Sequence, residues 1–295
     1  IDSAEFADVV VEEIRRSPLA VTDFKVRETM RDAPAPFKTS TLQQESARRN
    51  GMSPRRTMRV AQELFEGVSL PGRGPVGLIT YMRTDSLRIA PEAIEKCRGH
   101  IAAAYGSAYL PAKPNEHASK GRSQDAHEAI RPTDVEITPQ SLEGVLDGDQ
   151  MKLYSLIWRR FVASQMARAR VANATLAVSA GRAGMRQLGE TLVFPGWSAA
   201  WPIDLKGEPL SPATAGEALD LEDVQREQKF TRPPARYSEA GLVKLLEDEG
   251  VGRPSTYATI VETLYDRGYA ARGEDRRIQP TPLGMTVDSF LRKYF

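Results

Sequence analysis

The sequence GLITYMRTDS at residues 77–86 is the stretch around which the rest of the chain is organised. It begins with apolar and β-branched residues, which is typical of a β-strand, and its polar end at 84–86 indicates a chain reversal. On a strand Tyr81 and Arg83 would point to the same side, because side chains alternate. A phenol can act as a nucleophile, and a guanidinium can hold a phosphate through two hydrogen bonds. The alternative is a half-buried strand tyrosine beside a solvated arginine.

The same stretch resembles the active-site motif of type IA DNA topoisomerases, and Met82 favours the bacterial branch of that family. In the family the tyrosine attacks a DNA phosphodiester and keeps the 5′ end of the broken strand as a phosphotyrosine. The resemblance therefore implies that Tyr81 is the nucleophile and that Arg83 stabilises charge at the phosphate. The string TSTLQQ at 39–44 resembles the start of the family's tyrosine-bearing domain.

A second candidate side chain is His127, which lies 46 residues after Tyr81 in the string AHEAIRP at 126–132. A lone histidine can be purely structural. This string, however, resembles a second family signature, which implies that His127 contacts the phosphate to be cleaved. An imidazole can donate a hydrogen bond to a phosphate oxygen whether it is neutral or charged. No second ligand lies at helical or turn spacing, so we expect no metal site here.

A third candidate group follows Gly252, where GRPSTYA at 252–258 opens a helix. Helix N-termini offer free N–H groups and a positive dipole end, so an anion site is expected at Arg253, Ser255 and Thr256. Ordinary capping by Ser255 or Thr256 would need no ligand and remains the alternative. The string resembles a third signature, and DRGY at 266–269 resembles the one after it. The resemblance implies that Arg253, Thr256 and Arg267 lie along a bound single strand.

Composition limits the possible functions of the chain. Its 295 residues suffice for about two domains, and a net charge of +1 gives no overall basic field, so any nucleic-acid surface must be local. The single cysteine excludes an internal disulfide and a multi-cysteine zinc site, and suggests a reducing, intracellular setting. No apolar run reaches the ~18 residues of a membrane span. The chain begins at Ile1 without an initiator methionine, and we expect it to be a fragment.

Periodicity predicts an α+β protein. Helices are expected at about 40–50 and 54–66, the first with a capping box formed by Ser40 and Gln43, followed by a strand at 76–84 as the wing of a helix-turn-helix unit. A second helix pair with an arginine-rich hairpin is expected from Ser238 onward. Alternating runs predict antiparallel strands at 23–31, 173–179, 191–194 and 218–224. An arginine cluster near the first turn could be a solvated face or could bind phosphate; it comprises Arg48, Arg49, Arg55, Arg56 and Arg59.

The resemblance implies a multidomain topoisomerase arch. Its antiparallel β-rich domain would comprise 1–38 and 170–231, its active-site tyrosine domain of winged-helix type 39–169, and part of a helical gate-base domain 232–295. The parent activity would relax negatively supercoiled DNA without a nucleotide. The family's Mg²⁺ is bound by an N-terminal Toprim domain, whose ligands we do not find in this sequence. We therefore expect the chain alone not to relax DNA.

Two other readings belong to different functional classes. A non-catalytic winged-helix module that binds single-stranded DNA would use the same basic turns and helix pairs. A tyrosine recombinase is disfavoured because its set of arginines and histidines is not apparent around Tyr81. The resemblance further implies a cytoplasmic, nucleoid-associated monomer whose partners are single-stranded and negatively supercoiled DNA.

Overall fold

The computed structural model describes residues 3–117 and 127–294. By their contacts the residues form two compact units, one made of Ile1–Asp32 and Arg168–Pro233 and the other of Ala33–Ala167 and Pro234–Phe295. The expected division into three domains is not tested by this clustering and stays a prediction. The mixture of helices with antiparallel sheets confirms the predicted α+β class.

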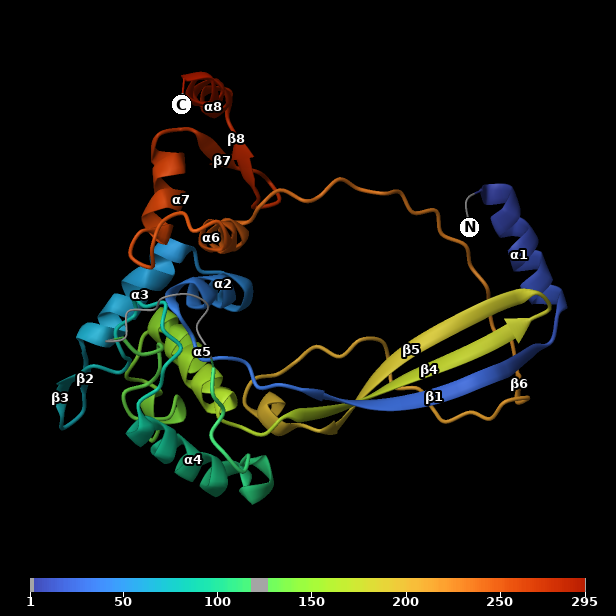
Figure 1. Cartoon of the computed structure of the whole chain (residues 1–295), viewed down its shortest axis with the longest axis horizontal. Coiled ribbons are helices and arrows are strands. Elements are labelled where there is room, and N and C mark those ends of the chain that lie inside the picture. Colours follow the sequence, from blue (N-terminus) through green and yellow to red (C-terminus); the bar gives the residue numbers. More distant parts are fainter. Residues whose placement is uncertain (1–2, 118–126, 295) are drawn as a thin grey trace. The chain divides into compact units, whose positions relative to one another are not determined.

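The first unit is built on a four-stranded antiparallel sheet in the order β5-β4-β1-β6. The strands β1, β4 and β5 are long and lie side by side (Figure 1). The pairing of β1 with β4 runs from Leu19↔Ala180 to Arg31↔Ala169. The predicted strands at 23–31, 173–179 and 191–194 are confirmed within longer ones, whereas only two residues of 218–224 form a strand. The elements are α1 (Ala4–Arg16), β1 (Leu19–Arg31), β4 (Ala169–Ala180), β5 (Ala183–Phe194), a 3-10 turn (Gly196–Ala199) and β6 (Ala218–Leu219).

The second unit contains the tyrosine stretch, and its core is helical. Its first helix pair carries a short hairpin, followed by two further helices, and residues 118–126 lie outside the described part. The elements up to Ala167 are α2 (Thr39–Asn50), α3 (Pro54–Glu66), β2 (Val68–Leu70), β3 (Gly74–Val76), α4 (Pro91–Tyr105), 3-10 turns at Ser107–Tyr109 and Gln140–Leu142, and α5 (Gly148–Ser164).

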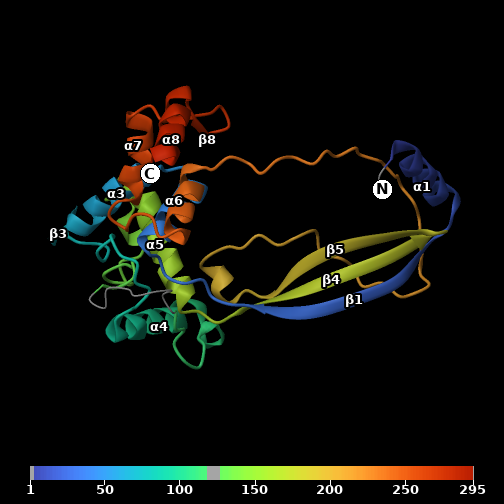
Figure 2. The same cartoon turned by 45° about the horizontal axis from the view of Figure 1, so that its top comes forward.

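The same unit continues after Pro233 with a second helix pair, a second hairpin and a last helix (Figure 2). Helix α6 packs beside α2, and α7 packs beside α3. The predicted repetition of a helix pair followed by a hairpin is therefore confirmed. The elements are α6 (Glu239–Asp248), α7 (Tyr257–Asp266), β7 (Ala270–Arg272), β8 (Ile278–Pro280) and α8 (Pro282–Tyr294).

Helix ends largely follow the predicted signals. Ser53 accepts a hydrogen bond from the Arg56 amide and Pro54 begins α3, while Gly51 ends α2 with φ of 66°. The capping box expected of Ser40 and Gln43 is wrong. Helix α2 begins at Thr39 with Lys38 at the N-cap, two residues earlier than a Ser40 cap would place it, and the Ser40 and Gln43 side chains face the interior, where they have no hydrogen-bond partner among the described residues. Burial of this face of α2 overrides the local capping pattern.

The arginine cluster near the first turn is paired with carboxylates. Arg48 and Arg49 both contact Glu45, Arg56 binds Asp149 through two hydrogen bonds, Arg59 contacts Glu63, and Arg55 contacts Glu262 of α7. These pairs reduce the free positive charge that a phosphate would meet. They also link α3 to α5 and α7.

Candidate active site

Residues 77–86, all described by the structure, form no regular strand, so the predicted strand at 76–84 is wrong. The wing of the first helix pair is instead the hairpin β2–β3, which ends at Val76, and beyond it only Ile79 makes an isolated bridge, to Pro132. Met82 and Arg83 form a bend, and burial alternates along residues 81–84. Met82 is 0% exposed, whereas Tyr81 is 40% exposed. Tyr81 and Arg83 are both exposed, and their predicted position on one side stays a prediction, because the strand on which it rested does not form.

The stretch starts at a close approach of two backbones. A Cβ atom on Gly77 would lie 2.7 Å from the Phe65 carbonyl oxygen, which is closer than real contacts allow. The Leu78 amide donates to the Leu64 carbonyl at 2.8 Å. The end of α3 thus fixes where the tyrosine stretch begins, and glycine is the residue that permits it.

On one side the stretch is held through Thr80. Its amide donates to the Arg131 carbonyl at 2.9 Å, its hydroxyl donates to the Ala129 carbonyl at 2.7 Å, and that hydroxyl accepts from the Arg131 amide at 3.0 Å. These contacts bring the string that contains His127 alongside the residue before Tyr81. Residues 80 and 129–131 are thus joined by the Thr80 hydroxyl as much as by backbone groups, and they do not form a regular ladder of backbone hydrogen bonds.

On the other side the stretch is held through Thr39, the first residue of α2. Its hydroxyl is within 2.7 Å of the Met82 carbonyl and 2.9 Å of the Thr84 carbonyl, and accepts from the Thr84 amide at 2.8 Å. Thr39, Met82 and Thr84 are each at most 1% exposed. A buried hydroxyl therefore fixes the backbone on both sides of Arg83.

Tyr81 lies between two rings. Its ring centroid is 5.7 Å from that of His127, with 37° between the planes, and 5.5 Å from that of Phe65, edge to face at 67°. The edge-to-face contact limits the orientations of the phenol. The structure thus brings together Tyr81 and His127, as the sequence predicted.

Charged groups near these rings differ in how far they are neutralised. Glu128 pairs with Arg131 at 2.8 Å and lies 4.0 Å from the guanidinium of Arg88. Arg83 has neither a hydrogen-bond partner nor an ion-pair partner among the described residues. An exposed, unpaired guanidinium next to an exposed phenol suits the binding of an anion.

The second candidate group is less regular than predicted. Helix α7 begins at Tyr257, so Pro254–Thr256 form a turn before it. The Thr256 hydroxyl accepts from the Arg253 amide at 2.8 Å and does not cap the helix. Burial, then the charge of Glu247, raises the pKa of Tyr257 at the start of α7; the charge of Asp85 also raises this pKa, and that of Arg253 lowers it.

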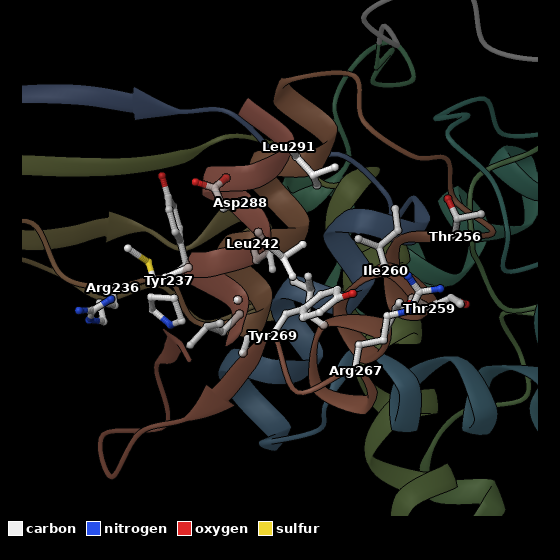
Figure 3. A pocket seen from close by; sticks show the side chains of 18 residues that line it. Arg236, Tyr237, Leu242, Thr256, Thr259, Ile260, Arg267, Tyr269, Asp288 and Leu291 are labelled. Atoms are coloured by element: carbon white, nitrogen blue, oxygen red, sulfur yellow. The ribbon is translucent and has the colours of Figure 1, made fainter. Parts of the chain in front are cut away.

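Thr256 and Arg267 share one groove, of about 930 Å³, between α7, the hairpin β7–β8 and α8 (Figure 3). Its walls include Ile260 and Leu291, while Arg236 and Arg267 supply positive charge. Arg253 and Ser255 are exposed and do not line it. The four predicted DNA-binding residues are therefore divided between an apolar groove and an exposed turn.

Sequence reasoning missed the residues that position this site: Thr39, Thr80 and Phe65. Both threonines lie inside strings that stood out, but their partners are far away in the sequence. As for metal binding, no group of three or more His, Cys, Asp or Glu side chains in the described ranges is arranged to hold an ion. The Mg²⁺ implied by the family thus finds no fitting ligand set here, and no chemical step is assigned to it. Within the same ranges no helix is long and apolar enough to cross a membrane.

Comparison with known proteins agrees with this geometry. The model of the DNA topoisomerase family matches residues 1–295. DNA topoisomerase 1 of Treponema pallidum is 48% identical over 264 residues, covering 88% of this chain and 36% of that protein. The Escherichia coli protein of the same name is 42% identical over 294 residues, covering 99% of this chain and 33% of that protein.

Among solved structures, full-length topoisomerase I from Thermotoga maritima superposes with a TM-score of 0.84 at 36% identity, covering 99% of this chain and 47% of that one. The chain therefore spans about a third of the length of the curated relatives named above. The family match over the whole chain confirms the resemblance seen in the four sequence strings. The chain belongs to the DNA topoisomerase family, in its bacterial, type IA topoisomerase I branch.

Proposed function

We propose that this chain carries the strand-cleaving tyrosine of a type IA DNA topoisomerase, and that Tyr81 is that nucleophile. The observation that supports this most directly is an exposed phenol held against the His127 ring, with an exposed Arg83 two residues further on that has no partner among the described residues. The segment is fixed from both sides by threonine hydroxyls, the buried one of Thr39 and the part-buried one of Thr80, so the phenol is presented by a rigid backbone.

In the proposed reaction the phenolic oxygen of Tyr81 attacks a phosphodiester of single-stranded DNA. The new O–P bond replaces the P–O3′ bond, the phenol loses its proton, and the departing 3′ oxygen gains one. The 5′ end stays on the protein as a phosphotyrosine, and attack by the 3′ hydroxyl reverses the step. Because the phosphodiester bond energy is retained in the intermediate, no nucleotide is required.

Arg83 and His127 are assigned to the phosphate. A guanidinium can bind two phosphate oxygens at once, and an imidazole can donate one further hydrogen bond. Preorganised donors of this kind stabilise the charge that develops in the transition state. Arg83 has no partner among the described residues that a phosphate would have to displace.

We further propose that Arg253, Ser255, Thr256 and Arg267 hold the single strand away from the reacting bond. Arg253 and Ser255 lie on an exposed turn, and Thr256 and Arg267 line the groove beside α7. The substrate of the whole protein would be negatively supercoiled DNA, with Mg²⁺ bound outside this chain. The proposal places a monomer in the bacterial cytoplasm at the nucleoid.

The test uses a single-stranded oligonucleotide labelled at its 3′ end, with the same oligonucleotide labelled at its 5′ end as a control. After incubation with Mg²⁺ and denaturation, the 3′ label should migrate with the protein and the 5′ label should not. The Tyr81→Phe variant should bind the oligonucleotide but retain no label. Each reaction is run alone and with the family's Toprim region added in trans.

The competing function is a DNA-binding module without catalysis, which the repeated helix-pair and hairpin arrangement favours. It predicts oligonucleotide binding with no covalent label under either condition. Migration of the 5′ label with the protein would contradict the proposal that Tyr81 is linked to the 5′ end of the broken strand.

A further inference from the structure

Arg160, on α5, holds a positive charge in a part-buried position. Burial lowers the pKa of its guanidinium to about 10, with the nearby charges of Glu45, Arg49 and Arg48 acting in both directions. The group therefore stays charged near neutral pH. A buried charge of this kind is costly unless specific partners compensate it.

Its partners belong to the segment that enters the second unit. The Nε of Arg160 donates to the Ala35 carbonyl at 2.6 Å, and its guanidinium lies over the Phe37 ring, 5.1 Å from the centroid. Pro34 and Pro36 flank Ala35 and have no N–H, so this linker has few ways to pair its backbone. The hydrogen bond to Ala35 pairs the linker backbone, and the stacking on Phe37 helps to compensate the part-buried charge of the guanidinium.

The linker in turn supports the residue before the nucleophile. The Phe37 carbonyl accepts from the Ile130 amide at 2.7 Å, and the two residues form an antiparallel bridge. The neighbours of Ile130 hold Thr80 through the hydroxyl and amide contacts to the Ala129 and Arg131 carbonyls. Phe37 and Ile130 are each 0% exposed, so the pair is rigidly packed.

We propose that Arg160 is a positioning residue for Tyr81, acting through the Phe37–Ile130 pair and Thr80. That Arg160 positions Tyr81 for catalysis rests on the proposed function of Tyr81. The chain of contacts from Arg160 through Phe37 and Ile130 to Thr80 does not depend on that function. The relay runs from α5 to the linker at 35–37, then to 129–131, and ends at the backbone immediately before the phenol.

Amide hydrogen exchange tests the link without requiring activity. Arg160→Lys keeps the charge but loses the planar fork and the stacking, and Arg160→Met removes the charge at similar volume. Either should speed exchange of the Ile130 and Thr80 amides about tenfold or more, since the lost contact is charge-assisted. The Leu78 amide, bonded to Leu64 on α3, should change by less than about threefold.

The matched control is Arg159→Met, a change at the adjacent, exposed position on the same helix, which should leave all these amides unchanged. If Arg160→Met does not fold, Arg160→Lys decides alone. Equal acceleration at Leu78, Thr80 and Ile130 would show a merely stabilising residue and overturn the proposal, as would unchanged exchange at Thr80.

A second arm measures the rate of adduct formation and the oligonucleotide Kd. Arg160→Lys should slow adduct formation about tenfold while Kd stays within a few fold, and Arg159→Met should change neither. An unslowed rate would overturn the role of Arg160 in positioning Tyr81 for the reaction. Absence of adduct in the unsubstituted protein would instead count against Tyr81 as nucleophile, and the exchange result would still decide the link.

Discussion

Replacing Thr39 by valine should destabilise the second unit by about 2–6 kcal/mol, because the hydroxyl pairs two buried backbone groups. Without it, the Met82 carbonyl and the Thr84 amide lose their partners at 2.7 and 2.8 Å. Each unsatisfied buried group costs about 1–3 kcal/mol. The Thr84 carbonyl keeps its bond from the Thr39 amide at 2.9 Å, so it adds little.

The assay is urea unfolding followed by Trp158, which lies in the same unit as Thr39. Trp197 and Trp201 belong to the other unit, and replacing both by phenylalanine in every variant leaves one reporter. Thr39→Ser is the matched control, since it keeps the hydroxyl and loses only a methyl group. A loss below about 0.5 kcal/mol for valine, or an equal loss for serine, would refute the hydrogen-bond argument.

Four further outcomes are expected. Arg83→Lys should raise the barrier to adduct formation by about 3–4 kcal/mol and leave oligonucleotide affinity within a few fold. Arg253→Ala should weaken oligonucleotide binding and leave the rate of adduct formation nearly unchanged. Equal loss of binding in both variants would contradict these separate roles. Affinity for single strands, measured by fluorescence anisotropy, should fall as salt rises from low to physiological levels. Burial raises the pKa of the Cys97 thiol to about 12, so a thiol reagent at pH 8 should label the protein only after unfolding. The Arg56 hydrogen bond lowers the pKa of Asp149, so this pair should stabilise the fold above pH 3.8 and lose its effect as pH falls below it; acid titration of Asp149→Asn should show a smaller drop.

Local signals predicted helices well, because caps and stops act over three or four residues. Ser53 with Pro54, and Ser238 at the start of α6, lie where the pattern placed them. The positions of the long strands were also predictable from the alternation of apolar and polar residues, but burial does not follow that alternation, since Val26 and Met30 on the apolar face of β1 are 56% and 59% exposed. The site residues Tyr81 and His127 were identified by their strings, and the structure brings their rings together.

What could not be predicted depends on partners distant in the sequence. The stretch after Val76 has the composition of a strand, but Thr39 and Thr80 take up its hydrogen bonds in place of a neighbouring strand. The cap expected at Ser40 failed because α2 turns that side chain inward. In both cases tertiary contacts overrode a local preference.

The alternation of burial at 81–84 fixes the register of Tyr81, the proposed nucleophile, more firmly than hydrogen bonds alone. A slip by one residue would bury Arg83 and expose Met82. An unpaired guanidinium in the interior costs several kcal/mol, and exposing a buried methionine costs about 1.5–3 kcal/mol. Both penalties oppose the slip, so loss of the Thr39 hydroxyl should loosen the segment without shifting it. The Thr39→Val protein should therefore still form its covalent link through Tyr81, more slowly and at the same residue, which peptide mapping of the adduct can verify.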